Sequence, residues 1–567
     1  MLNLFNTTKN IHHYLETNLK EVKIKNADMI KFVLFTALLF ASLTGIGQSA
    51  NGTVSKNTKI PTIADVGASK LPSDIAKVEA PFPMPDFKKP VFKNYSVNIK
   101  DQGAKPKMLA TTAIQKAVDE VNKNGGGSVI VPKGIWETGR IILKSNVNLH
   151  LENGAELHFS GEVKDYLPVV FTRNEGVEVM SMGALIYANG QENIAITGNG
   201  KLVGPALDCE LRKRSHLPDV IENVVPTDKP VDKRIYDGNN GGIIFPPMFI
   251  SPINCRNVYI EGITIGQTPF WNIVPVYCNG VIIRGVTVNS VGIPRGDGID
   301  IESSNNVLIE YSTLNCGDDC FTIKAGRNED GLRVNKPSEN IVIRYCLAQE
   351  GHGGITVGSE TAGVIRNMYV HDCVFDQTEV GIRFKTRRSR GGGGQSLTYE
   401  RIRMNLKGDA IKFDMLGTEQ FVGKLAVRLP ALEVNALTPK FKDITVRDID
   451  IEKARYFINI QGIPESPPSN VLVENAIVNS ERFFTASDVS GITIKNSNIN
   501  ISAPGTVQPG IAIIDGKNIS FEKLQFNMSK EPLTSKITGD LSDNIKFIGC
   551  TPEKPEGWLK TTWTKQK

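Results

Sequence analysis

The stretch NVLIEYSTL at residues 306–314 decides the fold, because its pattern returns along most of the chain. An asparagine comes first, followed by a short alternating apolar run, a polar corner and a second short strand. Copies of the pattern start at residues 193, 257, 280, 340, 367, 441, 470, 491, 518 and 544. Repeats of 20–50 residues are typical of solenoids, in which each coil buries its apolar face against the next.

These repeats predict an all-β chain folded as a parallel β-helix. The strands are short, the corners are polar or glycine, and no helical pattern separates the strands within a repeat. A β-propeller is the alternative, but it needs four strands in every repeat. The leading asparagines would stack as a ladder of side-chain amides at one bend of the coil.

One helix is expected before the repeats begin. In TTAIQKAVDEVN at residues 111–122, the apolar side chains Ile114, Ala117, Val118 and Val121 share one helical face. A β-helix leaves unpaired strand edges at its ends. We therefore expect this short helix to cap the N-terminal end of the coil stack.

The N-terminal region resembles an export signal. FVLFTALLFASL at residues 32–43 follows Lys31, and the run is short for a membrane span. An uncleaved anchor is the alternative. We expect translation to start at Met29, cleavage near residues 47–48, and an exported protein, periplasmic or extracellular, with no membrane insertion after cleavage.

Composition divides the chain into four segments. They are an N-terminal extension plus signal peptide at 1–47, an extended lead-in at 48–90, the β-helix domain with the catalytic motifs at 91–555, and a C-terminal tail at 556–567. The formal net charge of +5 over 567 residues argues against a nucleic-acid partner. We expect a monomer.

The eight cysteines leave two readings open. Export would permit disulfides, whereas free cysteines stacked in a core would explain the matching places of Cys346 and Cys373 in consecutive repeats equally well. Cys316 and Cys320 are near enough in sequence to bridge, and the sequence does not decide between the two states.

Four short motifs carry the chemistry. RGDGID at 295–300, GDDC at 317–320, GHGG at 351–354 and GIRFK at 381–385 supply three carboxylates, an imidazole and two cations. Hydrolysis of a glycosidic bond needs one carboxylic acid to protonate the leaving oxygen and a carboxylate to activate water on the opposite face. Cations near that pair would suit an acidic sugar, so the motifs together indicate hydrolysis of a uronic-acid glycoside.

In this order the motifs closely resemble glycoside hydrolase family 28, the polygalacturonases, and more specifically its bacterial exported exo-polygalacturonase members. The resemblance runs from about residue 93 to 404 and includes VPKGIWETG near its start. It implies a right-handed parallel β-helix. It also implies cleavage of α-galacturonosidic bonds in pectin-derived chains, with inversion, from the chain end.

The resemblance also assigns roles. Asp318 would be the general acid, Asp297 and Asp319 would hold the attacking water, and His352 would tune the protonation of the acid. Arg383 and Lys385 would bind the galacturonate carboxylate, and Tyr399 is the nearest match to a later family tyrosine at the sugar.

Elementary chemistry agrees with this division of roles. Three carboxyls on adjacent coils raise one another's pKa, so one can stay protonated while the others are ionised. Acid and base in an inverting site usually lie about 6.5–9.5 Å apart, which leaves room for water. Arg383 and Lys385 are two apart on a strand and share a face, whereas Phe384 between them faces the core.

One motif departs from the family pattern. Arg295 and Gly296 stand where the family has asparagine and threonine. Arginine is a cation with donors only, so we expect Arg295 to help choose the substrate by meeting a second acidic sugar or a rhamnose-containing chain.

Three other readings remain beside the leading one. They are a hydrolase of rhamnogalacturonan oligosaccharides, a pectate-lyase-like enzyme that eliminates with Ca²⁺, and a catalytically silent carbohydrate-binding β-helix. The lyase would have no use for the observed motif order. We expect no cofactor and no metal, since NEDG at 328–331 holds only part of a calcium loop. The expected partner is an acidic polysaccharide or oligosaccharide such as pectin.

Two insertions and a basic run flank the motifs. The insertions are residues 205–250 and 327–339, and loops that leave one face of a coil stack usually wall a cleft. We expect the first to block one end of the cleft and so favour exo action. The run RRSRGGGG at 387–394 could attract a polyanion or be a solvated basic loop.

Overall fold

The structure is a computed structural model that describes residues 59–215, 221–503, 509–528 and 531–558. The predicted signal peptide at 1–47 and the start of the lead-in lie outside the described residues. The chain divides into two units, Met1–Thr53 and Val54–Lys567, and everything below concerns the second unit.

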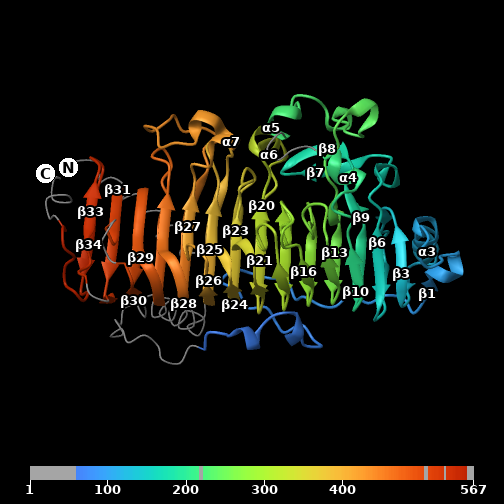
Figure 1. The fold of residues 1–567 in the computed structure, drawn as a ribbon, viewed down its shortest axis with the longest axis horizontal. Coiled ribbons are helices and arrows are strands. Elements are labelled where there is room, and N and C mark those ends of the chain that lie inside the picture. The colour runs from blue at the N-terminus through green and yellow to red at the C-terminus, as the bar shows by residue number, and fades with distance from the viewer. Residues whose placement is uncertain (1–58, 216–220, 504–508, 529–530, 559–567) are drawn as a thin grey trace, which may run out of the picture. The chain divides into compact units, whose positions relative to one another are not determined.

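The structure confirms the predicted right-handed parallel β-helix, with strands stacked along one axis (Figure 1). Successive coils build three parallel stacks of strands. The first stack holds the first strand of each repeat. Its separate strands are β5 (Val147–Leu151), β10 (Glu192–Gly198), β13 (Arg256–Glu261), β15 (Asn279–Arg284), β18 (Asn305–Glu310), β21 (Ser338–Arg344) and β34 (Asp543–Ile548).

The second stack holds the short strand after the corner. Its members include β6 (Ala155–Phe159), β11 (Lys201–Val203), β14 (Thr264–Gly266), β16 (Thr287–Asn289), β19 (Thr313–Asn315), β22 (Leu347–Ala348), β30 (Asn498–Ile501) and β32 (Gln525–Met528). Longer strands run through the corners and contribute to more than one stack. They are β24 (Ile365–Asp376), β26 (Gly393–Asn405), β28 (Lys440–Gln461), β29 (Ser469–Lys495) and β31 (Ile511–Glu522).

The third stack, called the site sheet here, carries the catalytic motifs. Its strands are β4 (Ile141–Ile142), β9 (Ala184–Asn189), β12 (Met248–Ile253), β17 (Ile299–Glu302), β20 (Phe321–Lys324), β23 (Gly351–Val357), β25 (Thr378–Lys385), β27 (Ile411–Asp414) and β33 (Ser535–Thr538), with parts of β28, β29 and β31. Strands β1 (Ser96–Asn98), β2 (Gly127–Val131) and β3 (Gly134–Thr138) begin the stack of coils.

The core is built from identical positions of successive repeats. One inward row of paired residues is Val258, Val281, Val307, Ile341, Met368, Leu397, Ile444 and Val471, all buried. Fully burying one such aliphatic side chain contributes about 1.5–3 kcal/mol. The row therefore holds neighbouring coils in register along the axis.

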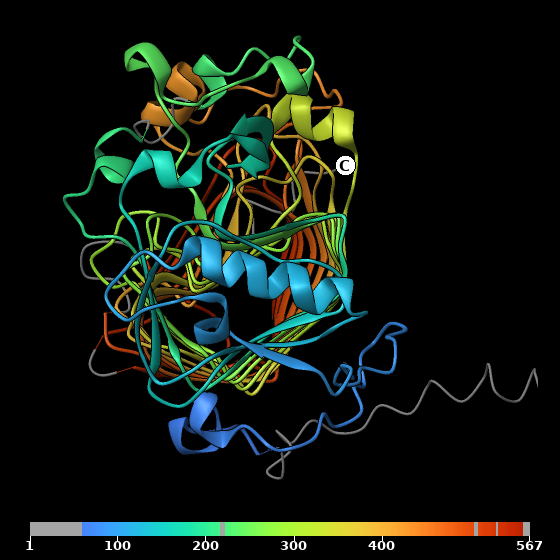
Figure 2. The same cartoon turned by 90° about the vertical axis from the view of Figure 1, so that its right-hand side faces the viewer.

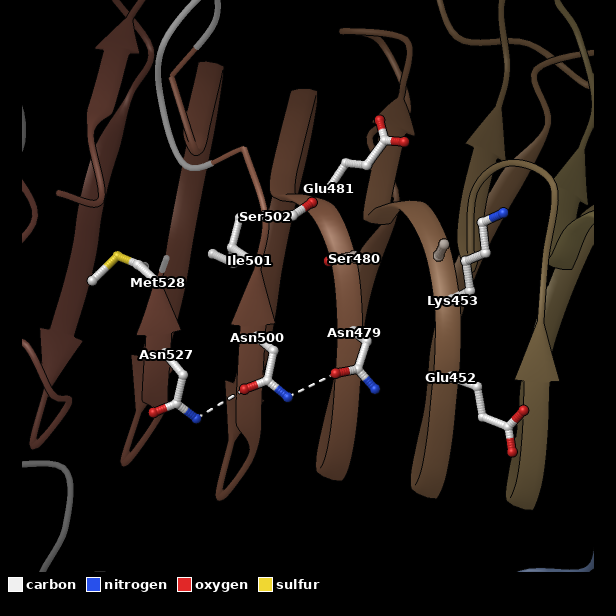
Figure 3. A pocket seen from close by; sticks show the side chains of 11 residues that line it. Glu452, Lys453, Asn479, Ser480, Glu481, Asn500, Ile501, Ser502, Asn527 and Met528 are labelled. Carbon is white, nitrogen blue, oxygen red and sulfur yellow. Dashed lines mark hydrogen bonds between the residues drawn. The ribbon is translucent and has the colours of Figure 1, made fainter. Parts of the chain in front are cut away.

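The predicted asparagine ladder is present. The Nδ2 atom of Asn367 donates to Oδ1 of Asn340 at 3.0 Å, and Asn340 donates to Asn306 at 3.4 Å. All three have positive φ, which asparagine tolerates better than most residues. A second ladder, Asn479–Asn500–Asn527, runs across the paired strands β29, β30 and β32 with hydrogen bonds of 2.8 and 2.9 Å, beside a surface pocket (Figure 3).

Helix α3 (Thr111–Lys123) is the predicted cap. It lies across the N-terminal end of the coil stack (Figure 2). The buried side chains of this helix include Ile114, Ala117, Val118 and Val121, as predicted. At the opposite end Trp558 is buried against Phe521 and Phe547, so the segment expected as a tail begins inside the fold.

The described part of the lead-in is a strap on the outer face of the first two stacks (Figure 1). It contains η1 (Ile63–Asp65) and η2 (Ala68–Lys70). Arg403 donates to the carbonyl of Pro61 at 2.8 Å, and Arg284 donates to that of Pro72 at 2.9 Å. Phe87 packs on buried residues of the first stack, so the strap ties several coils together.

Loops and short helices gather on one side of the coil stack (Figures 1 and 2). They include the hairpin β7 (Val170–Asn174)–β8 (Val177–Ser181), α4 (Glu210–Lys213), α5 (Ile221–Val224), η5 (Val231–Lys233), η6 (Asn239–Gly241), α6 (Asn328–Val334), α7 (Glu419–Val422) and η7 (Gly423–Leu425). Two further short turns, η3 (Ile99–Gln102) and η4 (Val163–Tyr166), lie near the cap. All eight cysteines are free thiols, seven of them buried, which favours the stacked-core reading.

Candidate active site

Six of the predicted site residues meet on the outward face of the site sheet. Asp297 precedes β17, and Asp318 and Asp319 precede β20. His352 begins β23, and the GIRFK cations end β25. These four strands are successive parallel neighbours, so residues almost 90 positions apart in sequence come together.

The three aspartates form a tight cluster. One oxygen of each of Asp297, Asp318 and Asp319 lies within 4.8 Å of the others. Asp297 and Asp319 are 3% and 1% exposed, whereas the Asp318 side chain is 23% exposed. The oxygens approach more closely than the roughly 6.5–9.5 Å expected for acid and base in an inverting site.

Glycines allow the motifs to approach one another. A Cβ atom on Gly317 would lie 2.1 Å from the carbonyl oxygen of Ile293, and one on Gly353 would lie 2.7 Å from Oδ1 of Asp319. Neither position could carry a larger residue without moving the catalytic turns. The glycine content of GDDC and GHGG is therefore part of the site geometry.

Asp318 is held by its neighbours as a carboxylate. Its Oδ1 lies 3.1 Å from Nδ1 of His352 and accepts a hydrogen bond from the backbone N–H of Asp319 at 3.0 Å. Burial alone would raise the pKa of Asp318, but the hydrogen bond from His352 and the charge of Lys385 lower it below its usual range. The same hydrogen bond raises the pKa of His352.

Asp297 has the opposite tendency. Burial, followed by the charges of Asp300 and Asp318, raises the pKa of Asp297 well above its usual value, although Lys324 opposes this. The pKa values of these two carboxyls are therefore shifted in opposite directions, and Asp297, not Asp318, is the one favoured in its protonated form.

The two GIRFK cations share a face, as expected. An Nη1–Oδ1 distance of 3.4 Å joins Arg383 to Asp319, and Lys385 lines the cavity above the carboxyls. Burial and then the charge of Arg383 lower the pKa of Lys385. Phe384 points inward and stacks on Phe413 with ring centroids 4.2 Å apart, which confirms its predicted core position.

The carboxyl cluster opens into a cavity of about 240 Å³. It is lined by Glu175, Trp271, Pro294, Arg295, Asp297, Gly317, Asp318, Asp319, Lys324, Arg327, His352, Ser359, Glu360, Lys385, Arg387, Gln420 and Phe421. The hairpin β7–β8 supplies its lining on one side through Glu175, and α7 supplies Gln420 and Phe421.

The insertion at 205–250 does not line this cavity with any of its described residues. It packs behind the hairpin instead, because Ile221, Val225 and Phe245 share an apolar cluster with Val177 and Val179. The insertion supports the wall and does not form it.

Arg295 is anchored to this hairpin. Its Nη1 lies 3.3 Å from Oε1 of Glu175, and its guanidinium lies over the ring of Phe270 at 5.0 Å. Arg327 approaches the other Glu175 oxygen at 3.0 Å. The residue that departs from the family pattern is thus part of the cavity wall and 23% exposed on its side chain.

The assignment of Tyr399 to the substrate is wrong. Its side chain is 0% exposed and packs edge-on against Phe384, with ring centroids 5.8 Å apart. Tyr399 pairs with Val370 and Val446 in the first stack, where this strand position faces the core. Proximity in sequence to GIRFK suggested a site role, but strand alternation directs the ring inward.

Several cavity residues were missed by sequence reasoning. Lys324 ends β20, and Glu360 follows β23. The outward alternation of Thr322 and Lys324 after GDDC was a usable signal for the lysine. Nothing local marked Trp271 or Glu360, which reach the cavity through neighbouring coils.

The basic run at 387–394 is not a solvated loop. Arg387 lines the cavity and lies 3.9 Å from the Phe421 ring centroid, and it is 4% exposed. Arg388 pairs with Glu465 at 2.6 Å. Arg387 therefore packs between the cavity and the ring of Phe421, and Arg388 is buried in an ion pair.

A cation could geometrically fit among three carboxylates this close together. The positive side chains of Lys324, Arg383, Lys385 and His352 already surround them, and we assign no metal site. Asp330 of the NEDG segment binds Arg234 and Arg333 at 2.7 and 3.0 Å, so it serves an ion pair between loops.

Comparison with known proteins places the chain in one family. The family described as Glycosyl hydrolases family 28 matches residues 238–481. A probable polygalacturonase of Vitis vinifera is 28% identical over 409 residues, covering 68% of this chain and 75% of the relative. An exo-poly-alpha-D-galacturonosidase of Dickeya chrysanthemi is 26% identical over 386 residues, covering 63% and 62%.

A solved structure agrees with these relatives. The hyperthermoactive exopolygalacturonase of Thermotoga maritima superposes with a TM-score of 0.63 at 29% identity, covering 73% of this chain and 93% of that one. Motif order, coil architecture and sequence similarity thus converge, and the chain belongs to family 28 of the glycoside hydrolases.

Proposed function

We propose that this glycoside hydrolase releases galacturonic acid from the ends of pectin-derived galacturonan chains, with inversion at the anomeric carbon. One observation carries the proposal. Three carboxyls, an imidazole and the cations of GIRFK converge on a single small cavity of the site sheet.

In the proposed reaction Asp318 donates its proton to the glycosidic oxygen as the bond to the anomeric carbon breaks. A water held between Asp297 and Asp319 attacks that carbon from the opposite face and gives up a proton to one of them. The water ends as the new anomeric hydroxyl, and the leaving chain keeps the proton from Asp318. Inversion is proposed from family membership, because the carboxyl spacing does not argue for it.

The substrate itself would prepare Asp318 for this role. The positive charge of Lys385 helps to lower the pKa of Asp318. A galacturonate carboxylate bound by Lys385 and Arg383 would neutralise part of that positive charge. The pKa of Asp318 would then rise, so that Asp318 is protonated and able to act as the acid only when an acidic sugar is bound.

Exo action is supported by the size and lining of the cavity. Its volume of about 240 Å³ is smaller than the roughly 300–1,000 Å³ of common ligand pockets. Glu175 lines it from the hairpin, and Phe421 lines it from α7. Such a space suits one terminal sugar better than the middle of a long chain.

The other readings find less support. The relatives described above are named as polygalacturonases or exo-galacturonosidases, which does not favour a rhamnogalacturonan substrate, an eliminating lyase or a silent binding protein. Acidic groups in place for both proton donation and water activation suit hydrolysis.

Product analysis tests the proposal directly. Polygalacturonate incubated with the wild-type protein should yield free galacturonic acid from the start, without a ladder of oligomers and without an ultraviolet-absorbing product. The Asp318→Asn variant should release almost none. Early oligomers would contradict exo action, and an ultraviolet-absorbing product abolished by EDTA would contradict hydrolysis.

We also propose that the protein is exported and acts as a monomer. In the described part of the chain, no helix has both the length and the apolar character needed to cross a membrane. N-terminal sequencing of protein recovered from the culture or periplasm would test the start at Met29 and cleavage near residue 47. Sedimentation at several concentrations would test the monomer.

A further inference from the structure

Lys324 is a buried cation at the floor of the cavity, directly beside the catalytic carboxyls. Its side chain is 5% exposed. The Nζ atom lies 3.9 Å from Asp297, 3.6 Å from Asp300 and 3.2 Å from Glu360. The same atom lies 4.4 Å from the centre of the Trp271 ring, which covers it. A flexible side chain is thus fixed among three carboxylates.

The strand register explains this position. Residues of β17 and β20 pair in parallel, so Asp300 lies beside Thr322 and Glu302 beside Lys324. Both strands direct these residues to the outer face of the site sheet. Asp297 lies in the turn just before β17, close enough for the lysine of the next coil to reach it.

Asp300 is the counterpart of Lys324 in this arrangement. It is 0% exposed, and neither of its carboxylate oxygens accepts a hydrogen bond from any described residue. One oxygen of Asp297 is likewise buried without a hydrogen bond from the described chain. Two buried carboxyls this poorly solvated need a nearby cation if either is to be ionised.

The charges that face Asp297 come from several elements. Asp300 is contributed by β17, Asp318 and Asp319 by the turn before β20, and Lys324 by β20 itself. Behind the lysine, Glu360 is bound by Arg327 at 2.7 Å. Burial, Asp300 and Asp318 raise the pKa of Asp297, and Lys324 is the opposing charge.

We propose that Lys324 is a positioning residue that favours the ionised, water-binding form of Asp297, and that Asp300 opposes it, so that this buried pair sets the pH at which the base becomes active. The inference deepens the proposed function, since it assumes that Asp297 acts as a base in hydrolysis. Lys324 does not need to touch the substrate for this role.

The test is the pH profile of kcat on polygalacturonate, which reports the groups of the substrate-bound enzyme. Lys324→Met removes a positive charge and should move the acid limb to higher pH, by roughly 1–3 units, the range that a neighbouring charge commonly produces. Asp300→Asn removes a negative charge and should move the same limb to lower pH. The double variant should fall between the two.

Matched controls separate this role from a structural one. Lys536→Met makes the same chemical change on an exposed residue of β33, in the same sheet but far along the stack, and should leave the profile unchanged. Lys324→Arg keeps the charge and should keep the limb near the wild-type position. If Lys324→Met fails to fold, the positions of the acid limb in Asp300→Asn and Lys324→Arg still test the inference.

Two outcomes would overturn the inference. One is an unmoved acid limb in a folded, active Asp300→Asn or Lys324→Met protein, and the other is a shift in the same direction for both. Failure of the wild-type protein to hydrolyse polygalacturonate would instead contradict the proposed function, and it would be seen before any variant is made.

Discussion

The imidazole of His352 lies 3.1 Å from the carboxyl of Asp318, on the next coil of the site sheet. The backbone N–H of the same histidine donates to the carbonyl oxygen of Asp318 at 3.0 Å. This double link fixes the orientation of the proposed acid. The hydrogen bond from the imidazole also stabilises the ionised form of Asp318 and lowers its pKa.

Replacing His352 should therefore change both rate and pH dependence. In His352→Ala, Asp318 loses a hydrogen bond to its charged form, the pKa of Asp318 rises, and the alkaline limb of kcat should move to higher pH. The rate should fall by up to the roughly 10²–10⁴-fold typical of acid–base residues. A pH profile measures both effects. Glu379→Gln, 4.0 Å from the other ring nitrogen, should change little, and an unmoved limb in His352→Ala would refute the link.

An activated substrate should distinguish the acid from the base. A nitrophenyl galacturonide has a leaving group that needs no protonation, so Asp318→Asn should keep much of its activity on it while losing activity on polygalacturonate. Asp297→Asn should lose activity on both, because water activation is still required. Initial rates on the two substrates give the answer. The reverse pattern would exchange the two roles.

The carboxylate-binding role of the GIRFK cations predicts a loss of discrimination. Lys385→Met should lower kcat/KM on polygalacturonate by about 10–100-fold, since a hydrogen bond to a charged group is worth about 1.5–3 kcal/mol. On methyl-esterified chains, whose sugars lack the charge, the same change should cost much less. Rates on the two substrates check this, with Lys536→Met as the unaffected control. An equal loss on both would point to a structural effect.

Tyr399 should matter for stability and not for catalysis. Its hydroxyl is buried without a hydrogen bond from the described chain, so Tyr399→Phe should leave activity unchanged and stability equal or slightly higher. Tyr399→Ala should cost about 3–5 kcal/mol through the cavity it leaves. Thermal unfolding and kcat measure the two effects. A large rise in KM for a stable Tyr399→Phe protein would contradict the buried position.

Arg295 should set substrate preference through the cavity wall. In Arg295→Asn, Glu175 loses an ion pair at 3.3 Å, and the wall loses the cation that departs from the family pattern. We expect a change in the relative kcat/KM for galacturonan and rhamnogalacturonan oligosaccharides. Comparison of the two substrates with wild-type and variant protein provides the check. An unchanged ratio would count against a role in specificity.

Much of the fold could be read from the repeat NVLIEYSTL, because a single coil cannot bury its apolar face alone and stacking follows from repetition. The helix at 111–122 could equally be predicted from the spacing of its apolar residues. Tyr399 shows where prediction from the sequence fails. Its side-chain direction depends on which stack its strand joins, and a residue count from GIRFK does not contain that information.

The sequence by itself determined the coil architecture and the chemical groups of the site, since periodicity and motif composition are local properties of the chain. Tertiary structure alone decided which charges surround those groups. Lys324, Glu360 and Glu175 line the cavity from neighbouring coils and a hairpin. Burial raises the pKa of Asp297, whereas the hydrogen bond from His352 and the charge of Lys385 outweigh burial and lower the pKa of Asp318. The physical reason is that electrostatic energy depends on distance and solvent access, and both arise only when the coils stack.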